Sequence, residues 1–384
     1  MDNYSIHTIV PQLRFPEFKN DENWEVAKVG DVIKTITPPK KLNSSEYKKT
    51  GKYPIIDQSQ SYICGYSDDD DALMNHNNED LIVFGDHTCV LKFVSFPFIQ
   101  GADGIKIIKS KDSNKLVESF LFQSLQNNPV VSREYKRHFS ELKEKEFCFS
   151  RRIAEQRKIA SCLFSMDAYI SATKEKLELL KTYKKGLMQK LFPAKGKKLP
   201  ELRFKEFEKD GEWEEKKLAT IVHQITTGKL DANAMVSNGE YRFYTCAKDY
   251  AFINEYAFDT EALLISGNGA HLGYIHYYKG KFNAYQRTYV LSDFQCDIFY
   301  LKYYLESFLP DRINKEKKEG NTPYIVLSTL TEMDIILPSN FEQHKIADCL
   351  TSIDEMINQY TNKVTFLELY KKGLMQQMFP TNNN

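Results

Sequence analysis

The sequence is poor in the features that mark membrane proteins, disulfide-rich secreted domains and metal-binding modules. Its seven cysteines lie far apart and form no Cys-x-x-Cys pair, which favours reduced thiols over a disulfide or zinc framework. No apolar run approaches the roughly 18 residues of a membrane span, and the polar start lacks the pattern of a secretory leader. We therefore expect a cytoplasmic protein that neither enters a membrane nor holds a metal ion.

Net charge is also absent, because the 52 lysines and arginines equal the 52 aspartates and glutamates. This balance gives no indication of a polyanionic partner, so any case for one must rest on local charge. At 384 residues, of which 42% are hydrophobic and 27% charged, the chain is long enough for two domains with cores of their own.

Several catalytic motifs are missing. The sequence has no Gly-x-x-x-x-Gly-Lys-Ser/Thr loop for a nucleotide, no His-Glu-x-x-His pair for zinc, and no Asn-Pro-Pro-Tyr or Asp-Pro-Pro-Tyr tetrapeptide for a flipped adenine. Asp311, Glu316 and Lys318 superficially resemble a nuclease motif, but their spacing is short and their surroundings look helical. The acidic run Asp68 to Asp71 fits a solvated loop better than a metal site. We expect a chain that is not a catalyst and binds no cofactor itself; a self-contained nuclease is the less favoured alternative.

What the sequence does contain is an internal repeat. Residues 155–193 and 342–380 align without a gap and agree at 21 of 39 positions. A second pair of similar segments begins at Pro11 and Pro200, and the stretches between these borders share little beyond their pattern. The frame is repeated while its contents differ, which predicts one scaffold that carries two different recognition surfaces.

The long repeats predict helices. In each, apolar residues recur in alternating steps of four and three, from Ile159 to Leu191 and from Ile346 to Met378, as in a coiled-coil seam of more than four heptads. Pro193 and Pro380 end the pattern. We expect two helices of about 35 residues and about 50 Å each. A pseudo-twofold relation between the halves requires the helices to pack antiparallel, and coiled-coil dimerisation of two chains is the alternative.

Between the repeats, each half has apolar, turn-rich stretches that predict strands followed by a helix. Strands are expected at 80–86, 89–98 and 104–108 in the first half and at 262–268, 273–278 and 288–291 in the second, with helices at 117–125 and 298–308. The expected fold class is α+β, with two α/β domains separated by two long antiparallel coiled-coil helices. The expected borders are 1–152 for the first domain, 153–195 for the central helix, 196–340 for the second domain and 341–384 for the last helix.

Polar loops at the tips of these strands are the candidate recognition sites. Amide, guanidinium and hydroxyl side chains read base edges, although the same residue types are ordinary turn formers. A basic run with interleaved aromatic residues, from Arg133 to Arg152, adds candidate phosphate contacts unless it is a solvated helix face. The candidate DNA-contacting residues are His87, Thr88, Gln100, Arg133 and Lys136 in the first half and Ser266, Asn268, His271, Gln286, Arg287 and Tyr324 in the second.

These segments together resemble the specificity subunit of type I restriction-modification enzymes. The resemblance rests on Leu-Arg-Phe-Pro-Glu-Phe and Leu-Arg-Phe-Lys-Glu-Phe before Trp24 and Trp213, on Glu-Gln-Arg-Lys-Ile-Ala and Glu-Gln-His-Lys-Ile-Ala at the helix starts, and on Tyr-Lys-Lys-Gly-Leu-Met-Gln in both helices. The segment 320–324 also matches the family's usual approach to the second helix, whereas the first half departs from it at Arg133. In that family, two variable target-recognition domains alternate with two repeated helical regions.

The resemblance implies a bipartite, gapped site in double-stranded DNA, with one half read by each domain and the gap fixed by the helices. It also implies two methyltransferase subunits that carry S-adenosylmethionine, and motor-nuclease restriction subunits that use ATP and Mg²⁺. A coiled-coil adaptor without a DNA role is the main alternative. The residues expected to dock the methyltransferases are Tyr183, Lys184, Leu187, Tyr370, Lys371 and Leu374.

Overall fold

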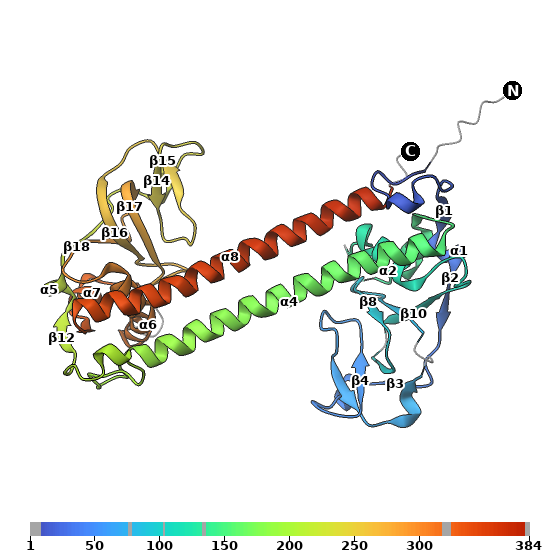
Figure 1. Cartoon of the computed structure of the whole chain (residues 1–384), viewed down its shortest axis with the longest axis horizontal. Coiled ribbons are helices and arrows are strands. Elements are labelled where there is room, and N and C mark those ends of the chain that lie inside the picture. Colours follow the sequence, from blue (N-terminus) through green and yellow to red (C-terminus); the bar gives the residue numbers. More distant parts are fainter. Residues whose placement is uncertain (1–8, 76–78, 103, 133–135, 317–323, 381–384) are drawn as a thin grey trace. The chain divides into compact units, whose positions relative to one another are not determined.

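The computed structural model describes residues 9–75, 79–102, 104–132, 136–316 and 324–380. The chain divides into two compact units (Figure 1). Unit 1 comprises residues 1–174 and 362–384, and unit 2 comprises residues 175–361. The division cuts both long helices, α4 (Ile153–Leu191) and α8 (Asn340–Met378), so each unit contains a part of each helix.

Besides its helix segments, unit 1 consists of short strands and helices. In chain order these are β1 (Glu25–Lys28), α1 (Val29–Val32), β2 (Ile33–Ile36), β3 (Lys41–Leu42), β4 (Tyr53–Ile56), β5 (Gly65–Ser67), β6 (Leu73–Met74), β7 (Leu81–Gly85), β8 (Leu91–Val94), β9 (Phe98–Gly101), β10 (Ile105–Ser110), α2 (Glu118–Asn127), α3 (Phe139–Glu144) and β11 (Glu146–Phe149). One sheet has the order β2-β10-β7-β8, a second joins β3-β9-β4-β5 with β6 beside β9, and β1 pairs with β11. Strand β7 is buried along its whole length because alternate side chains enter two different cores.

Unit 2 has a larger sheet. Its elements are β12 (Glu214–Lys217), α5 (Leu218–Ile221), β13 (Val222–Thr227), β14 (Tyr241–Tyr244), β15 (Ala251–Ile253), β16 (Phe258–Ser266), β17 (Ile275–Ala284), β18 (Thr288–Phe294), α6 (Ile298–Glu316), α7 (Leu327–Thr331) and β19 (Asp334–Leu337). Six strands form one sheet in the order β13-β18-β16-β17-β14-β15, and β12 pairs with β19. Only the pairing of β14 with β17 is parallel within that sheet as described.

The short repeat is fixed to the start of a long helix by a buried ion pair in each unit. Arg14 donates from two nitrogens to both carboxylate oxygens of Glu155, at 2.7 and 2.8 Å. Arg203 makes the same two bonds to Glu342, at 2.8 Å each. Both glutamate side chains are 0% exposed. In each unit, the repeated Leu-Arg-Phe motif supplies the arginine and the repeated Glu-Gln motif supplies the glutamate of one ion pair. The two motifs occur together because a buried carboxylate needs a cation and hydrogen bonds.

The glutamine that follows each of these glutamates connects the long helix to the domain. The Gln156 side chain accepts a hydrogen bond from the Val117 N–H, 2.9 Å, just before α2. The Gln343 side chain accepts one from the Asp297 N–H, 2.9 Å, just before α6. Equivalent residues thus set the start of equivalent helices in the two units.

The parts of α4 and α8 within each unit pack against one another in opposite directions. In unit 1, Asp167 pairs with Lys371 at 2.6 Å and Lys174 with Glu368 at 2.6 Å, so the numbering rises along α4 as it falls along α8. In unit 2, Leu191 near the end of α4 shares a core with residues near the start of α8, namely Ile346, Ala347 and Leu350. Every position in the two predicted apolar series is buried or half-buried.

The predicted strands and helices are present with shifted ends. The stretch expected as one strand at 89–98 is β8 followed by a turn into β9, and β17 continues six residues beyond the expected 278. Each long helix has 39 residues, not about 35, because the helix starts before the repeated Glu-Gln. Among the residues that the structure describes, no helix is long and apolar enough to cross a membrane.

Candidate functional site

Polar loops of unit 2 meet at one end of its six-stranded sheet. The Gly267 N–H, just after β16, donates to the carbonyl of Arg287 just before β18, at 2.8 Å. The Ile325 N–H donates to the carbonyl of Gly267, also at 2.8 Å, and Asn268 forms a β-bridge with Tyr324. Three segments far apart in the sequence are therefore held side by side by backbone hydrogen bonds.

Most of the residues predicted to contact DNA in unit 2 lie on this loop cluster. Gln286 and Arg287 are exposed, Asn268 and His271 are half-buried, and Tyr324 is 60% exposed. These side chains present amide, guanidinium and aromatic groups on one surface, as base readout requires. The structure thus brings together residues that were separate candidates in the sequence analysis.

Ser266 is the exception in unit 2. Its side chain is 0% exposed, and its hydroxyl has no hydrogen-bond partner among the described residues. Because Ser266 is the last residue of β16, a strand with neighbours on both sides, its side chain points into the fold. A buried hydroxyl does not reach a base, so we withdraw Ser266 from the DNA-contacting residues.

Unit 1 has the same backbone frame at the equivalent loops. The Asp86 N–H, just after β7, donates to the carbonyl of Gly104 just before β10, at 2.6 Å. The His138 N–H donates to the carbonyl of Asp86 at 2.7 Å. These two bonds match those of Gly267 in unit 2, although the side chains on the two frames differ.

A buried lysine in unit 1 and a half-buried histidine in unit 2 each support a further loop. Lys92 of β8 donates to the carbonyls of Asp57 and Ser61, at 2.7 and 2.6 Å. His276 of β17 holds its Nε2 2.9 Å from the carbonyl of Ala247. Burial lowers the pKa of both Lys92 and His276. The loops after β4 and β14 therefore belong to the two loop clusters, and sequence patterns did not point to them.

In unit 1, the predicted residues His87 and Thr88 lie on this frame. The Thr88 hydroxyl donates to the carbonyl of Gln58, 2.7 Å, and is thus used within the turn, although the residue is exposed. The half-buried His87 holds Nδ1 3.1 Å from the carbonyl of Lys136. Lys136 is exposed and pairs with Glu141 at 2.9 Å. Three of the predicted positions are therefore brought together.

The other two predicted positions of unit 1 do not join this group. Gln100 is 2% exposed, because β9 lies in the middle of its sheet between the parallel strands β3 and β4. We therefore withdraw Gln100 from the base-reading residues. Arg133 lies outside the described residues.

The acidic run of unit 1 is paired with lysines on neighbouring strands and turns. Each of three consecutive aspartates forms a hydrogen-bonded ion pair with a different lysine, and these hydrogen bonds lower the pKa of each carboxyl. The run is therefore a set of exposed ion pairs and needs no metal ion. The pairs are Lys48–Asp68, Lys40–Asp69 and Lys52–Asp70, with nitrogen-to-oxygen distances of 2.8, 2.6 and 2.7 Å.

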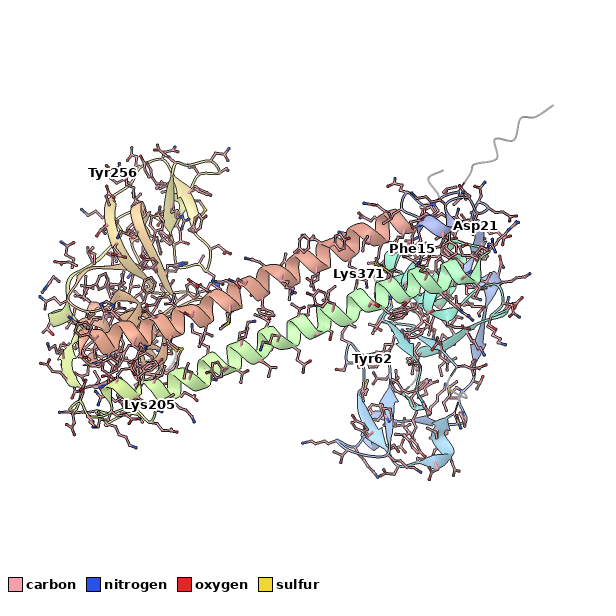
Figure 2. The ribbon with its side chains drawn as sticks, in the orientation of Figure 1. Phe15, Asp21, Tyr62, Lys205, Tyr256 and Lys371 are labelled. Carbon is pink, nitrogen blue, oxygen red and sulfur yellow. The ribbon has the colours of Figure 1, made fainter. Side chains whose placement is uncertain are left out.

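On the long helices, the predicted docking residues divide into two groups. Tyr183 and Tyr370 are 60% and 51% exposed. Lys184 and Lys371, the next residues, face the opposite helix instead and form ion pairs with Asp354 and Asp167, at 2.7 and 2.6 Å (Figure 2, in which Lys371 is labelled). We correct the prediction for the two lysines, because a half-buried, paired ammonium contributes to helix packing.

Leu187 and Leu374 also face inward, against the cores of unit 2 and unit 1. Some of the exposed apolar side chains on the long helices lie one turn before these tyrosines or beside them. In unit 1 these are Phe366 and Leu369, each 64% exposed, and in unit 2 Leu179, 58% exposed. We call Phe366, Leu369 and Tyr370 the unit 1 helix face, and Leu179 and Tyr183 the unit 2 helix face.

Comparison with known proteins agrees with this repeated architecture. A family model described as the type I restriction modification DNA specificity domain matches residues 21–182 and 210–365. The chain belongs to this specificity family. Each of the two matches contains one loop frame and most of one long helix.

Relatives in the specificity family differ in how much they share. The type I restriction enzyme EcoDI specificity subunit of Escherichia coli is 39% identical over 142 residues, which are 37% of this chain and 31% of that protein. The MjaVIII specificity subunit of Methanocaldococcus jannaschii is 25% identical over 92% of this chain and 91% of its own length. The crystal structure of an S subunit from M. genitalium has the same fold, with a TM-score of 0.71 at 18% identity over 97% of this chain and 100% of that one.

The described residues of the nuclease-like motif in this specificity-family chain are not grouped as an active site. Asp311 and Glu316 lie on the single helix α6. Glu316 accepts a hydrogen bond from the Thr329 hydroxyl, 2.6 Å, and pairs with Arg312 at 3.1 Å, while Lys318 lies outside the described residues. In the described part of the chain, no three His, Cys, Asp or Glu side chains are grouped to hold a metal.

Proposed function

We propose that the chain is the sequence-specific DNA-recognition subunit of a type I restriction-modification complex. Each unit reads one half of a gapped site in double-stranded DNA through its loop cluster. The observation that carries this proposal is the loop frame itself, because the same backbone bonds recur at Asp86 and Gly267 while the side chains on them differ. A repeated frame with different contents suits two half-sites of different sequence.

We propose further that α4 and α8 form an antiparallel coiled coil that fixes the gap between the half-sites. The opposite directions of the paired segments within each unit support this, as do the ion pairs Lys184–Asp354 and Lys371–Asp167, which are related by the repeat. A helix of 39 residues is about 58 Å long at about 1.5 Å per residue, against about 34 Å for one turn of DNA. The proposed recognition domains are 1–152 and 196–340, and the proposed helical regions 153–195 and 341–384.

Catalysis is assigned in this proposal to other chains. Two methyltransferase subunits that carry S-adenosylmethionine dock on the two helix faces, and motor-nuclease restriction subunits use ATP and Mg²⁺. Support comes from the repeat, since Leu179 and Tyr183 occupy the positions that Phe366 and Tyr370 occupy in the other helix. Exposed aromatic and aliphatic groups at equivalent places suit two copies of one partner.

Methylome sequencing tests the proposal at its simplest level. The chain is expressed together with the methyltransferase subunit of its own restriction-modification system in cells that lack other adenine methylation. The expected result is a methylated motif in two parts separated by a fixed gap. A stable complex that adds no motif and binds DNA no better than the methyltransferase alone would favour the adaptor alternative instead.

A further inference from the structure

We propose that Arg242 of unit 2 is a specificity-determining residue that reads one guanine of the DNA site. This inference rests on the proposed function. Arg242 lies on β14, two residues before the end of the strand, and outside the loops to which the sequence patterns pointed.

The guanidinium of Arg242 is held in a fixed place. It lies between the rings of Tyr250 and Tyr278, with its central carbon 4.3 and 4.6 Å from the two ring centroids. One terminal nitrogen is 3.4 Å from the hydroxyl of Tyr244, which is 2% exposed and part of the core below. Two aromatic contacts restrict the side chain before any ligand arrives, so little freedom remains to be lost on binding.

No carboxylate among the described residues neutralises this cation. In the part of the chain that the structure describes, Arg242 forms no ion pair, whereas Arg203 and Arg312 of the same unit pair with Glu342 and Glu316. A half-buried guanidinium between neutral rings keeps most of its five N–H donors for a ligand. The ligand that fits the Arg242 guanidinium is a hydrogen-bond acceptor with negative electrostatic potential.

Arg242 is continuous with the loop cluster of unit 2. The loop after β14 has Cys246 at one end, with its Sγ 3.5 Å from the carbonyl of Arg287, and Tyr250 at the other, stacked on Arg242. Arg242 is paired with Phe282, five residues before Arg287. Beyond that pair, the Tyr285 N–H donates to the carbonyl of Tyr244 at 2.9 Å, so backbone hydrogen bonding connects the end of β14 to the turn that carries Arg287.

Because the plane of the Arg242 guanidinium is fixed, the edge of a base is a better ligand for it than a phosphate. A planar guanidinium fork matches the O6 and N7 acceptors of guanine in the major groove, and this bidentate contact discriminates against the other bases. A phosphate contact needs only a positive charge, which a flexible lysine supplies without any clamp. When β4 is aligned with β14 from the last residue, unit 1 has Pro54 at this position, so the contact is specific to unit 2.

The test measures DNA binding by the purified complex of this chain with its methyltransferase. Duplexes carry the methylated motif, with each guanine replaced in turn by 7-deazaguanine, which lacks the N7 acceptor. The wild-type complex should lose about tenfold or more in affinity at one guanine. Arg242→Ala should lose a similar factor on the unmodified duplex, become insensitive at that guanine and keep its sensitivity at the others. Arg242→Lys should behave like Arg242→Ala, because lysine lacks the fork.

Lys281→Ala is the matched control. Lys281 is an exposed cation on the same sheet that stacks on Tyr256 at 4.7 Å, and its removal should leave the guanine pattern unchanged (Tyr256 is labelled in Figure 2). The inference fails if Arg242→Ala keeps the wild-type sensitivity at every guanine, or weakens binding to the motif and to random DNA equally, as loss of a phosphate contact would. If the wild-type complex binds its motif no tighter than random DNA, the proposed function fails, and the role of Arg242 with it.

Discussion

At the scale of single residues, buried charges hold the repeated frame together. The hydrogen bond to Glu155 raises the pKa of Arg14, and the bond to Glu342 raises that of Arg203. Each arginine also donates to two backbone carbonyls of a turn within its own short repeat. Removing either arginine therefore leaves a buried carboxylate without its cation.

Arg14→Ala should lower the free energy of unfolding of unit 1 by about 3–5 kcal/mol, because the Glu155 carboxylate is left buried and uncompensated. Arg203→Ala should do the same to unit 2. The chain has two tryptophans, Trp24 and Trp213, one in each unit, so urea unfolding followed by tryptophan fluorescence reports each unit when the other tryptophan is replaced by phenylalanine.

Arg151→Ala is the matched control for this prediction. Arg151 is 60% exposed and pairs with Glu22 and Glu25 at the surface, so its loss should change the stability of unit 1 little. An Arg14→Ala effect no larger than that of Arg151→Ala would contradict the role given to the buried pair.

The lysine-paired aspartates give unit 1 a defined pH dependence. Because the lysines lower the folded-state pKa of Asp68, Asp69 and Asp70, the stability that these carboxylates contribute is present above their unfolded pKa of about 3.9 and is lost as pH falls through the lowered values. The triple variant to asparagine should melt at a lower temperature than wild type at pH 7. The difference in melting temperature should shrink as the pH falls below about 3.9 and through the lowered pKa values, and a constant difference would show that the effect is not electrostatic.

Individual residues of the candidate site show which parts of it could be predicted from the sequence and which could not. Gln286 and Arg287 were predictable because a strand tip between two apolar runs must be a loop. The role of Arg242 was not, because its clamp depends on the parallel pairing of β14 with β17, across about forty residues, which no local pattern encodes. Gln100 was misplaced for a similar reason, since its burial follows from non-local strand neighbours.

At the scale of the helices, periodicity predicted which side faces inward. Lys184 and Leu187 fall in the apolar series, so their contact with the opposite helix and with the core follows from the heptad pattern. Tyr183 lies outside the series and is exposed. The docking prediction followed the residues that are identical in the two repeats. It therefore combined residues from both sides of the helix, because identity between the repeats does not distinguish a packing side from a binding side.

Charge on the unit 1 helix face should weaken docking of one methyltransferase. Phe366 and Tyr370 stack with ring centroids 6.0 Å apart, and Phe366→Glu with Tyr370→Glu places two carboxylates where an apolar contact is proposed. The affinity for that methyltransferase should fall at least tenfold, so that mass photometry finds one copy per chain where wild type binds two. Leu179→Glu with Tyr183→Glu should remove the other copy.

Gln376→Glu adds charge to an exposed position of the same segment of α8 and serves as the control, with two copies retained. Retention of both copies by the Phe366 and Tyr370 variant would exclude this face as the docking site.

At the scale of the whole molecule, the repeat predicted the two-part architecture, while the loops that differ between the units are the proposed recognition surfaces. The long helices and the order of the strands followed from the heptads and the apolar runs. Base readout depends on side chains presented by a frame that only the fold assembles, from the segments around Asp86 and Gly267. For that reason the sequence predicted two recognition domains without predicting which bases each domain recognises.

The most direct test of the central claim is methylome sequencing of two loop variants beside wild type. Gln286→Ala with Arg287→Ala alters the unit 2 cluster, and His87→Ala with Lys136→Ala alters the unit 1 cluster. We predict that each variant relaxes or loses base preference in one half of the gapped motif, a different half for each, while the other half and the gap stay unchanged. Relaxation of both halves by either variant, or of the same half by both, would contradict the assignment of one half-site to each unit.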